Sequence, residues 1–134
     1  MNGVLVDSNV ILDIMTEDPQ WSAWSAQALA DCAEHSELLI NPIVYAEVSV
    51  RFETVEELEE VFPPTAFGRA PLPWEAAFLA GKCFVRYRRQ GGLRRSPMPD
   101  FYIGAHAAVS GLRLLTRDAS RYRTYFPHLH LVAP

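Results

Sequence analysis

Hydrophobic positions in this chain fall into short continuous runs separated by stretches with helical spacing, a pattern that predicts strands alternating with helices. The first run, Val4 to Asp7, is wholly apolar until its terminal acid, as in a strand that is covered on both faces. Four later runs predict further strands: Leu38 to Ile40, Thr65 to Phe67, the start of Leu112 to Asp118, and Leu129 to Val132.

Capping residues mark where the helices begin. We expect helices after Ser8, from Asp18-Pro19, from Asn41-Pro42, and from Thr54, which has a capping-box glutamate at position 57. Pro73 opens the longest helix, which ends at Gly91-Gly92. Its spacing predicts a buried side made of Trp74, Ala77, Phe78, Gly81 and Val85. The helix from Asp18 has a similar apolar stripe: Trp21, Trp24, Ala28, Leu29 and Cys32. A further helix follows Asp100, and a short one follows Asp118.

Strands separated by helices of this length predict a mostly parallel sheet with right-handed crossovers. We therefore expect one domain over residues 1–134, an α/β fold arranged as a three-layer αβα sandwich. Ligands of such sheets collect beyond the carboxyl ends of the strands, which is where Asp7 and Asp118 are predicted to lie.

Composition narrows the class of protein. With 49% hydrophobic and 21% charged residues, the chain resembles ordinary globular domains, and no apolar run approaches the roughly 18 residues that span a bilayer. Met1-Asn2-Gly3 leads directly into the first strand without a secretory signal, which predicts a cytoplasmic protein and no membrane partner. Cys32 and Cys83 both fall in helical patterns, so we expect them to be reduced and buried.

Charge is divided unevenly along the chain. Residues 1–62 hold thirteen acids and one base, Arg51, whereas residues 63–134 hold eleven bases and three acids. An acidic protein can therefore still present a basic face to a polyanion. Much of that basic charge precedes Asp100, and we interpret four of its residues as candidate contacts to a polyanion: Arg88, Arg89, Arg94 and Arg95. A solvated helix face is the alternative.

Four carboxylates are candidates for a shared site: Asp7, Glu47, Asp100 and Asp118. Each also has a structural explanation. Asp7 and Asp100 suit helix caps, Asp118 suits a turn, and Glu47 can pair with Arg51 one helical turn later. Glu47 nevertheless lies among apolar neighbours, where an unpaired glutamate is rare.

Convergence of the four acids has a physical consequence. Six carboxylate pairs at about 3 to 4 kcal/mol each, for an effective dielectric near 20, oppose folding by on the order of 20 kcal/mol. Net domain stability is only about 5 to 15 kcal/mol. Such a site must take up protons or bind cations, and an all-oxygen donor set favours Mg²⁺ or Mn²⁺ over Zn²⁺.

The acids and their flanks resemble the successive motifs of PIN-domain ribonucleases. The matching segments are strand-Asp7-Ser8-Asn9-Val10, Tyr45-Ala46-Glu47-Val48, Asp100-Phe101-Tyr102-Ile103-Gly104-Ala105-His106-Ala107 and Leu115-Thr116-Arg117-Asp118. The short chain and its ending Tyr122-Arg123-Thr124-Tyr125-Phe126-Pro127 are similar to VapC-type toxins of bacterial toxin-antitoxin pairs.

The resemblance implies a metal-dependent endoribonuclease toxin. Asp7, Glu47, Asp100 and Asp118 would be the catalytic, metal-binding residues for Mg²⁺ or Mn²⁺, and the implied partners are an RNA, with transfer RNA a common target in the family, a cognate antitoxin protein and a second copy of the chain. Ser8, Asn9 and Thr116 adjoin the acids and are candidates to orient them, although turn formation also explains them.

Two other functions remain open at this point. An aspartyl-phosphate phosphatase also places an acid after its first strand, but Asn9 stands where its signature requires a second Asp, and Lys82 lies within a helix. A non-catalytic binding module would use the acids only structurally. Among the histidines, His106 suits a packed, hydrogen-bonded position better than contact with substrate.

Overall fold

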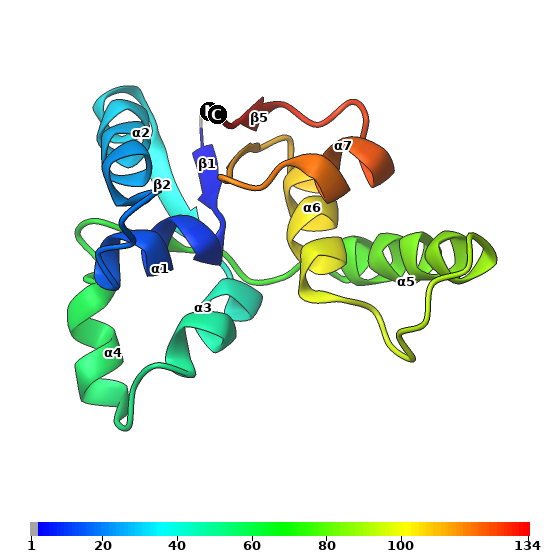
Figure 1. Ribbon diagram of the computed structural model, residues 1–134, viewed down its shortest axis with the longest axis horizontal. Helices are drawn as coiled ribbons and strands as arrows, with labels where there is room; N and C mark the ends of the chain where they lie inside the picture. The colour runs from blue at the N-terminus through cyan, green and yellow to red at the C-terminus, as the bar shows by residue number, and fades with distance from the viewer. Residues whose placement is uncertain (1–2) are drawn as a thin grey trace.

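The computed structural model describes residues 3–134, and its core is a parallel sheet (Figure 1). Met1 and Asn2, which belong to the segment expected to lack a secretory signal, lie outside the described residues. The described strands follow the order β3-β2-β1-β4-β5. Their bounds are β1 Gly3–Val6, β2 Glu37–Ile40, β3 Gly68–Arg69, β4 Arg113–Leu115 and β5 Leu131–Val132. All four strand pairings are parallel, so the predicted sheet is confirmed.

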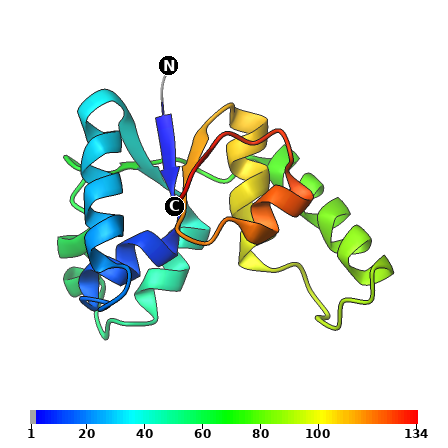
Figure 2. The same cartoon turned by 45° about the horizontal axis from the view of Figure 1, so that its top comes forward.

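Helices form the outer layers. Their bounds are α1 Ser8–Met15, α2 Ser22–His35, α3 Pro42–Ser49, α4 Val55–Val61, α5 Trp74–Arg89, α6 Pro99–Ser110 and α7 Ser120–Tyr125. α2 lies on one side of the strands and α6 on the other, with α5 packed on the outside of α6 (Figure 2). The predicted three-layer αβα arrangement is therefore confirmed. None of the helices in residues 3–134 is long and apolar enough to cross a bilayer.

Local capping explains several of the boundaries. Thr54 and Glu57 form the predicted capping box at the start of α4, and the Asn41 side chain accepts a hydrogen bond from the Val44 amide at the start of α3. The predicted start of α2 at Pro19 is wrong, because the Asp18 carboxylate accepts hydrogen bonds from the amides of Gln20 and Trp21 and holds a turn there. Helix α2 then begins at Ser22.

Two strands are shifted from their predicted positions. The strand expected at residues 65–67 lies at Gly68–Arg69, because residues 64–66 form a turn in which the amides of Ala66 and Phe67 donate to the Pro63 carbonyl. The strand expected at residues 129–132 is confined to Leu131–Val132. Short edge strands carry little hydrophobic pattern, so sequence locates them poorly.

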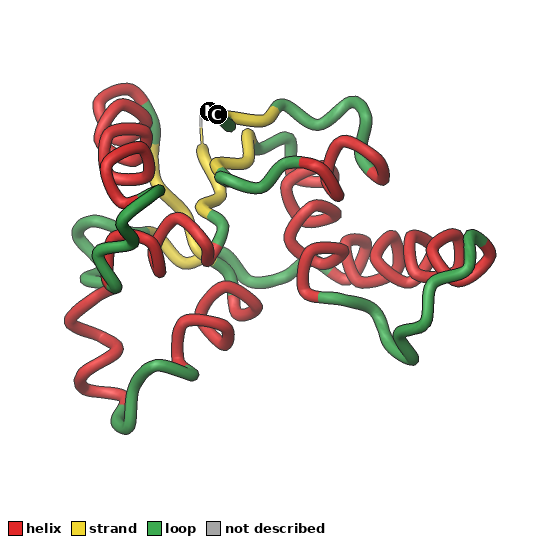
Figure 3. The backbone as a smooth tube through the Cα atoms, in the orientation of Figure 1, coloured by secondary structure: helices red, strands yellow, loops and turns green. Residues whose placement is uncertain are grey.

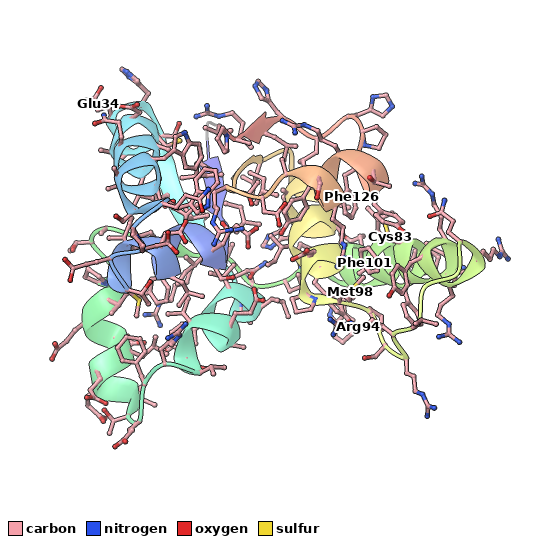
Figure 4. The ribbon with its side chains drawn as sticks, viewed as in Figure 1. Glu34, Cys83, Arg94, Met98, Phe101 and Phe126 are labelled. Carbon is pink, nitrogen blue, oxygen red and sulfur yellow. The ribbon has the colours of Figure 1, made fainter. Side chains whose placement is uncertain are left out.

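The predicted buried face of α5 is wrong in a way that matters for function. Ala76, Ala80 and Cys83 are the buried positions of this helix, whereas Trp74 is 88% exposed and Phe78 is 68% exposed. The helix packs through its small side chains because these allow close approach to α6. Cys83, one of these residues, is labelled in Figure 4. Two large aromatic side chains are therefore left on the outer surface.

A close contact between α6 and α7 fixes the geometry beside the sheet. Gly104 of α6 faces the ring of Phe126, and a Cβ atom at this position would overlap that ring. The absence of a side chain lets α7 pack directly against α6. This contact brings Tyr122 of α7 toward Asp100 at the start of α6.

Candidate carboxylate site

Asp7 is the most enclosed member of the site. Its amide donates to the Leu115 carbonyl at 2.9 Å, which extends the β1–β4 pairing by one residue and fixes the side chain at the sheet edge. Its residue surface is 3% exposed. Oδ1 accepts a hydrogen bond from the Ser8 amide at 2.8 Å, so the predicted capping role is real.

The other oxygen of Asp7 accepts several side-chain hydrogen bonds. Oδ2 lies 2.8 Å from the Tyr122 hydroxyl, 2.9 Å from Thr116 Oγ1 and 3.4 Å from Asn9 Nδ2. Burial nevertheless raises the pKa of Asp7 to about 6, while the Tyr122 hydrogen bond lowers it and the charges of Asp100 and Glu47 raise it. The carboxylate therefore has a specific orientation but a strong tendency to gain a proton or a cation.

Glu47 faces the same edge from α3. Ser8 Oγ donates to Glu47 Oε1 at 2.8 Å, and within residues 3–134 Glu47 forms no salt bridge with Arg51, so that structural alternative does not apply. Burial raises the pKa of Glu47, the hydrogen bond from Ser8 lowers it, and the charge of Asp100 raises it. The glutamate is thus oriented toward the other acids.

Asp100 occupies the first turn of α6, after the N-cap residue Met98, so it is not the predicted helix cap. Its Oδ1 lies 3.5 Å from the Tyr122 hydroxyl, and its Oδ2 lies 3.8 Å from Arg121 Nη1. Burial raises the pKa of Asp100, the charge of Arg121 lowers it, and the charge of Asp118 raises it. Asp100 is therefore the acid that links Asp7 and Glu47 to Asp118.

Asp118 lies at the exposed rim, in the loop between β4 and α7. Its amide donates to Thr116 Oγ1 at 3.2 Å, and its Oδ1 accepts from Ser120 Oγ at 3.3 Å. The turn role proposed for this residue is therefore also correct. Its charge reaches Asp100, but the side chain has no hydrogen bond to the other three acids in the described chain.

The four acids form one electrostatic neighbourhood without a closed ligand cage. Within residues 3–134, no three His, Cys, Asp or Glu side chains stand close enough together to hold a metal ion as they are. The chemistry of the donors fits a hard divalent cation, because all are carboxylate oxygens and three belong to groups whose burial disfavours an uncompensated charge. Side-chain rotation toward a common centre is what ion binding would require.

Ser8, Asn9 and Thr116 all contact an acid, as predicted for residues that orient the site. Thr116 has the central position, since its hydroxyl is bonded to Asp7, to Asn9 Nδ2 at 3.1 Å and to the Asp118 backbone. Two contributors were missed. Tyr122 and Arg121 lie on the short α7. The only signal for them in the sequence is that an aromatic residue, Tyr122, follows Asp118 closely and is of a type that is often buried.

A partly buried ion pair holds the Thr116–Asp118 loop against α1. Arg117 donates to both oxygens of Asp13, at 3.0 Å from Nε to Oδ2 and 3.1 Å from Nη2 to Oδ1, and Ser25 Oγ donates to the same carboxylate at 2.8 Å. The Arg117 amide also donates to Asn9 Oδ1 at 3.2 Å. Because both sides of Arg117 are anchored, the loop that carries Thr116 and Asp118 is fixed relative to Asp7.

The basic stretch borders the site but does not enter it. Arg88 Nη1 donates to the carbonyls of Gly92 and Arg94, at 3.3 and 2.9 Å, so part of this guanidinium closes the loop between α5 and α6 that Figure 3 shows in green. Arg89, Arg94 and Arg95 are exposed. Arg88 therefore has a structural task that the sequence analysis missed.

His106 is a packed residue, as predicted. It is 2% exposed, its Nδ1 lies 3.0 Å from Asn41 Nδ2, and burial lowers its pKa. Both described cysteines, Cys32 and Cys83, are free and buried, which confirms that prediction as well.

The sequence of the chain has a match among known families. The family model described as the PIN domain matches residues 4–127. The chain belongs to the PIN domain family. Comparison with curated protein sequences finds no match.

Solved structures share the fold of this PIN domain. It is similar to a chain of VapBC2 from Rickettsia felis bound to a promoter DNA fragment, with 16% identity over 98% of each chain and a TM-score of 0.73. It is also similar to VapBC-1 from nontypeable Haemophilus influenzae, with 16% identity over 98% of this chain and 97% of that chain and a TM-score of 0.71. It is similar as well to a chain of a toxin-antitoxin complex from Klebsiella pneumoniae, with 22% identity over 96% of this chain and 95% of that chain and a TM-score of 0.68.

Proposed function

We propose that this PIN domain is an endoribonuclease that depends on Mg²⁺ or Mn²⁺. The observation that carries the proposal is the group of four acids at the carboxyl edge of the sheet, with the buried Asp7 at its centre and a pKa of about 6. A bound divalent ion supplies an activated water for in-line attack on a phosphodiester and stabilises charge on the leaving oxygen. Hydrolysis of this kind leaves 5′-phosphate and 3′-hydroxyl ends.

The protein's own groups divide the remaining tasks. Asp7, Glu47, Asp100 and Asp118 hold the ion, and the hydrogen bonds from Ser8, Asn9, Thr116 and Tyr122 keep the oxygens of Asp7 and Glu47 oriented before it binds. Such preorganisation lowers the cost of assembling the site around substrate. No covalent intermediate or catalytic histidine is required, which agrees with the packed position of His106.

RNA approaches over the basic loop between α5 and α6. Arg89, Arg94 and Arg95 are exposed there. Arg88 uses Nη1 to hold the loop, and its other N–H groups can donate to RNA. The loop leads directly to Met98 and Asp100. Phosphate contacts of this type bind single strands with little sequence preference, so the identity of the RNA must come from other contacts.

We further propose that the protein is the toxin of a type II toxin-antitoxin pair. The support is its full-length fold similarity to chains described as VapBC and toxin-antitoxin complexes. The antitoxin would lay an apolar helix near α1 and α4 and send a basic side chain toward the acids. Val50, at the end of α3, is 83% exposed and Val55, the first residue of α4, is 63% exposed, and Glu56, Glu57 and Glu60 are exposed on α4.

Glu59, on the same helix, is already paired within the chain. Glu59 accepts from Arg69 Nη2 at 2.8 Å and from the Tyr45 hydroxyl, and these hydrogen bonds lower its pKa. It therefore stabilises the α3–α4 region and is not counted among the residues that attract a basic partner.

The proposed homodimer uses the exposed face of α5. Trp74 and Phe78 stand one helical turn apart on this face, and Val85 is 40% exposed further along the helix. Large apolar side chains grouped in this way on one helix are typical of a protein interface. Lys82 Nζ lies 5.0 Å from the centroid of the Phe78 ring, and the ring remains largely exposed beside this contact.

The position of Lys82 also weighs against the phosphatase alternative. A phosphoaspartate enzyme needs a cation beside its nucleophile, whereas Lys82 packs over Phe78 on the outer helix and Asp7 is surrounded by hydrogen-bond donors. If the protein were instead a non-catalytic binding module, it would cleave no phosphate ester. Phosphomonoester turnover or the absence of RNA cleavage by folded protein would favour one of these alternatives.

Growth of a bacterial host tests the toxin role. Expression of the wild-type chain should arrest growth, and Asp100→Asn should relieve the arrest. Coexpression of a small DNA-binding protein encoded immediately upstream should also restore growth. Normal growth with soluble protein that cleaves RNA when purified would contradict the toxin role and leave the nuclease proposal standing.

A further inference from the structure

Arg121 is a cation at the edge of the carboxylate site that the function proposed above does not yet use. Its Nη1 lies 3.8 Å from Asp100 Oδ2 and 2.8 Å from the thioether sulfur of Met98, and its side chain is 41% exposed. Met98 is buried at the N-terminal end of α6 (Figure 4). A thioether is a weak acceptor and a contact of 3.8 Å is long for an ion pair, so the guanidinium is held loosely.

Arg121 also lines a pocket on the surface of α7. A shallow pocket of about 310 Å³ is lined by Tyr87, Ser120, Arg121, Thr124 and Tyr125. It lies between α7 and the C-terminal part of α5, and Arg121 is the lining residue that also reaches Asp100. Aromatic rings beside a guanidinium are the features with which proteins hold single-stranded nucleotides, by stacking on the base and pairing with the phosphate.

We propose that Arg121 exchanges partners during the reaction cycle: it pairs with Asp100 in the metal-free protein and binds an RNA phosphate beside the scissile bond when a divalent cation occupies the acids. The proposal rests on the metal-dependent nuclease function. A cation that draws Asp100 inward competes with Arg121 for the same carboxylate, and the released guanidinium then faces the pocket. Occupation of the site by metal and binding of RNA are therefore coupled through one side chain.

Arg121→Gln tests both halves of the exchange. Loss of the competing charge should tighten Mn²⁺ binding to the RNA-free protein by about two- to fivefold, the range expected for an exposed ion pair. Binding of a labelled single-stranded RNA should weaken by about tenfold in Ca²⁺, as expected for loss of a hydrogen bond to a charged group, with a smaller loss in EDTA, where Asp100 retains Arg121. RNA integrity is checked on a gel after each titration.

Two further variants separate the proposed role from a general charge effect. Arg123→Gln removes a base from an exposed position of the same helix and should leave Mn²⁺ affinity unchanged. Arg121→Lys keeps the charge but loses the planar donor pair, so it should retain near wild-type Mn²⁺ affinity and bind RNA with intermediate strength.

Unchanged or weaker Mn²⁺ binding by folded Arg121→Gln would overturn the counter-ion role. An equal loss of RNA affinity in EDTA and in Ca²⁺ would overturn the exchange. Failure of the wild-type protein to bind or cleave RNA would contradict the proposed nuclease function instead, while the Mn²⁺ measurement would still decide whether Arg121 competes with metal.

Discussion

The phenol of Tyr122 donates a 2.8 Å hydrogen bond to Asp7 Oδ2 and lies 3.5 Å from Asp100 Oδ1. One buried hydroxyl thus stands between two proposed metal ligands from different parts of the chain, the residue that follows β1 and the first turn of α6. Its ring is 1% exposed, so the hydroxyl has little freedom to move away. Tyr122 therefore sets the distance between the two carboxylates in the metal-free protein.

Tyr122→Phe tests this positioning role. The hydrogen bond from Tyr122 lowers the pKa of Asp7, so its loss should raise that pKa above about 6 and let protons compete with metal at higher pH. Mn²⁺ affinity is measured from pH 5 to 8, and the fall in affinity toward low pH should begin at a higher pH in the variant than in the wild type. The free energy of unfolding should also fall by about 1 kcal/mol. A shift of this pH dependence would show that Tyr122 positions Asp7, whereas a side chain that only packs would change stability and leave the pH dependence of Mn²⁺ affinity unchanged.

The raised pKa of Asp7 predicts how stability depends on pH without metal. The native state holds this proton more tightly than the unfolded chain, with a pKa of about 6 against 3.8. Asp7 therefore opposes folding above pH 6, by about 3 kcal/mol for a difference of roughly two pKa units, and this penalty disappears as pH falls toward 4. Other groups add their own pH dependence, so the comparison between variants is what isolates Asp7.

Urea unfolding in EDTA measures this effect. Asp7→Asn should be as stable as the wild type or more stable at pH 7, and the difference between the two proteins should shrink between pH 7 and pH 4.5. Asp31→Asn, on the exposed surface of α2, is the matched control and should parallel the wild type. A constant difference between Asp7→Asn and the wild type across this range would contradict the assigned pKa.

The basic loop predicts a specific salt dependence. Replacing Arg94 and Arg95 with Ala should weaken binding of unrelated single-stranded RNAs to a similar extent. It should also flatten the log-log dependence of affinity on salt by about 0.7 per lost phosphate contact. Both side chains are exposed, so the variant should unfold like the wild type. An unchanged slope would identify these arginines as part of a solvated surface with no RNA contact.

The exposed aromatic face of α5 predicts the oligomeric state. Trp74→Glu combined with Phe78→Glu should convert a dimer to a monomer in sedimentation experiments, because the charges would be buried without partners. Folding should persist, since these side chains are 88% and 68% exposed. Val109→Glu, on α6, is a control at a position that is 41% exposed. A wild-type monomer at all concentrations tested would rule out this interface.

The sequence predicted the parts of the site that depend on local pattern. Asp7 and Asp118 were predicted to lie beyond the carboxyl ends of parallel strands, and the pairing of β1 with β4 brings these two ends to one edge of the sheet. The hydrogen bond between Thr116 and Asp7 is a further contact that this pairing makes possible. The contacts of Tyr122 and Arg121 were not predicted. Both depend on how α7 packs against α6 through Gly104 and Phe126, and no local signal encodes that packing.

Helix α5 shows a second limit of sequence patterns. Its apolar residues occupy two faces, and spacing alone favoured the face with the larger side chains. The structure buries Ala76, Ala80 and Cys83 because small side chains let α5 approach α6 closely. Periodicity therefore identified the helix but not which of its faces is buried.

The most direct test of the nuclease proposal is cleavage of RNA by purified protein as Mn²⁺ or Mg²⁺ is titrated. The wild type should cleave only with added metal and should leave 5′-phosphate ends. Asp7→Asn and Asp100→Asn should be inactive at every metal concentration while keeping their circular dichroism spectra. Undiminished cleavage in excess EDTA, or full activity in both variants, would contradict the assignment of these carboxylates as a metal-dependent catalytic site.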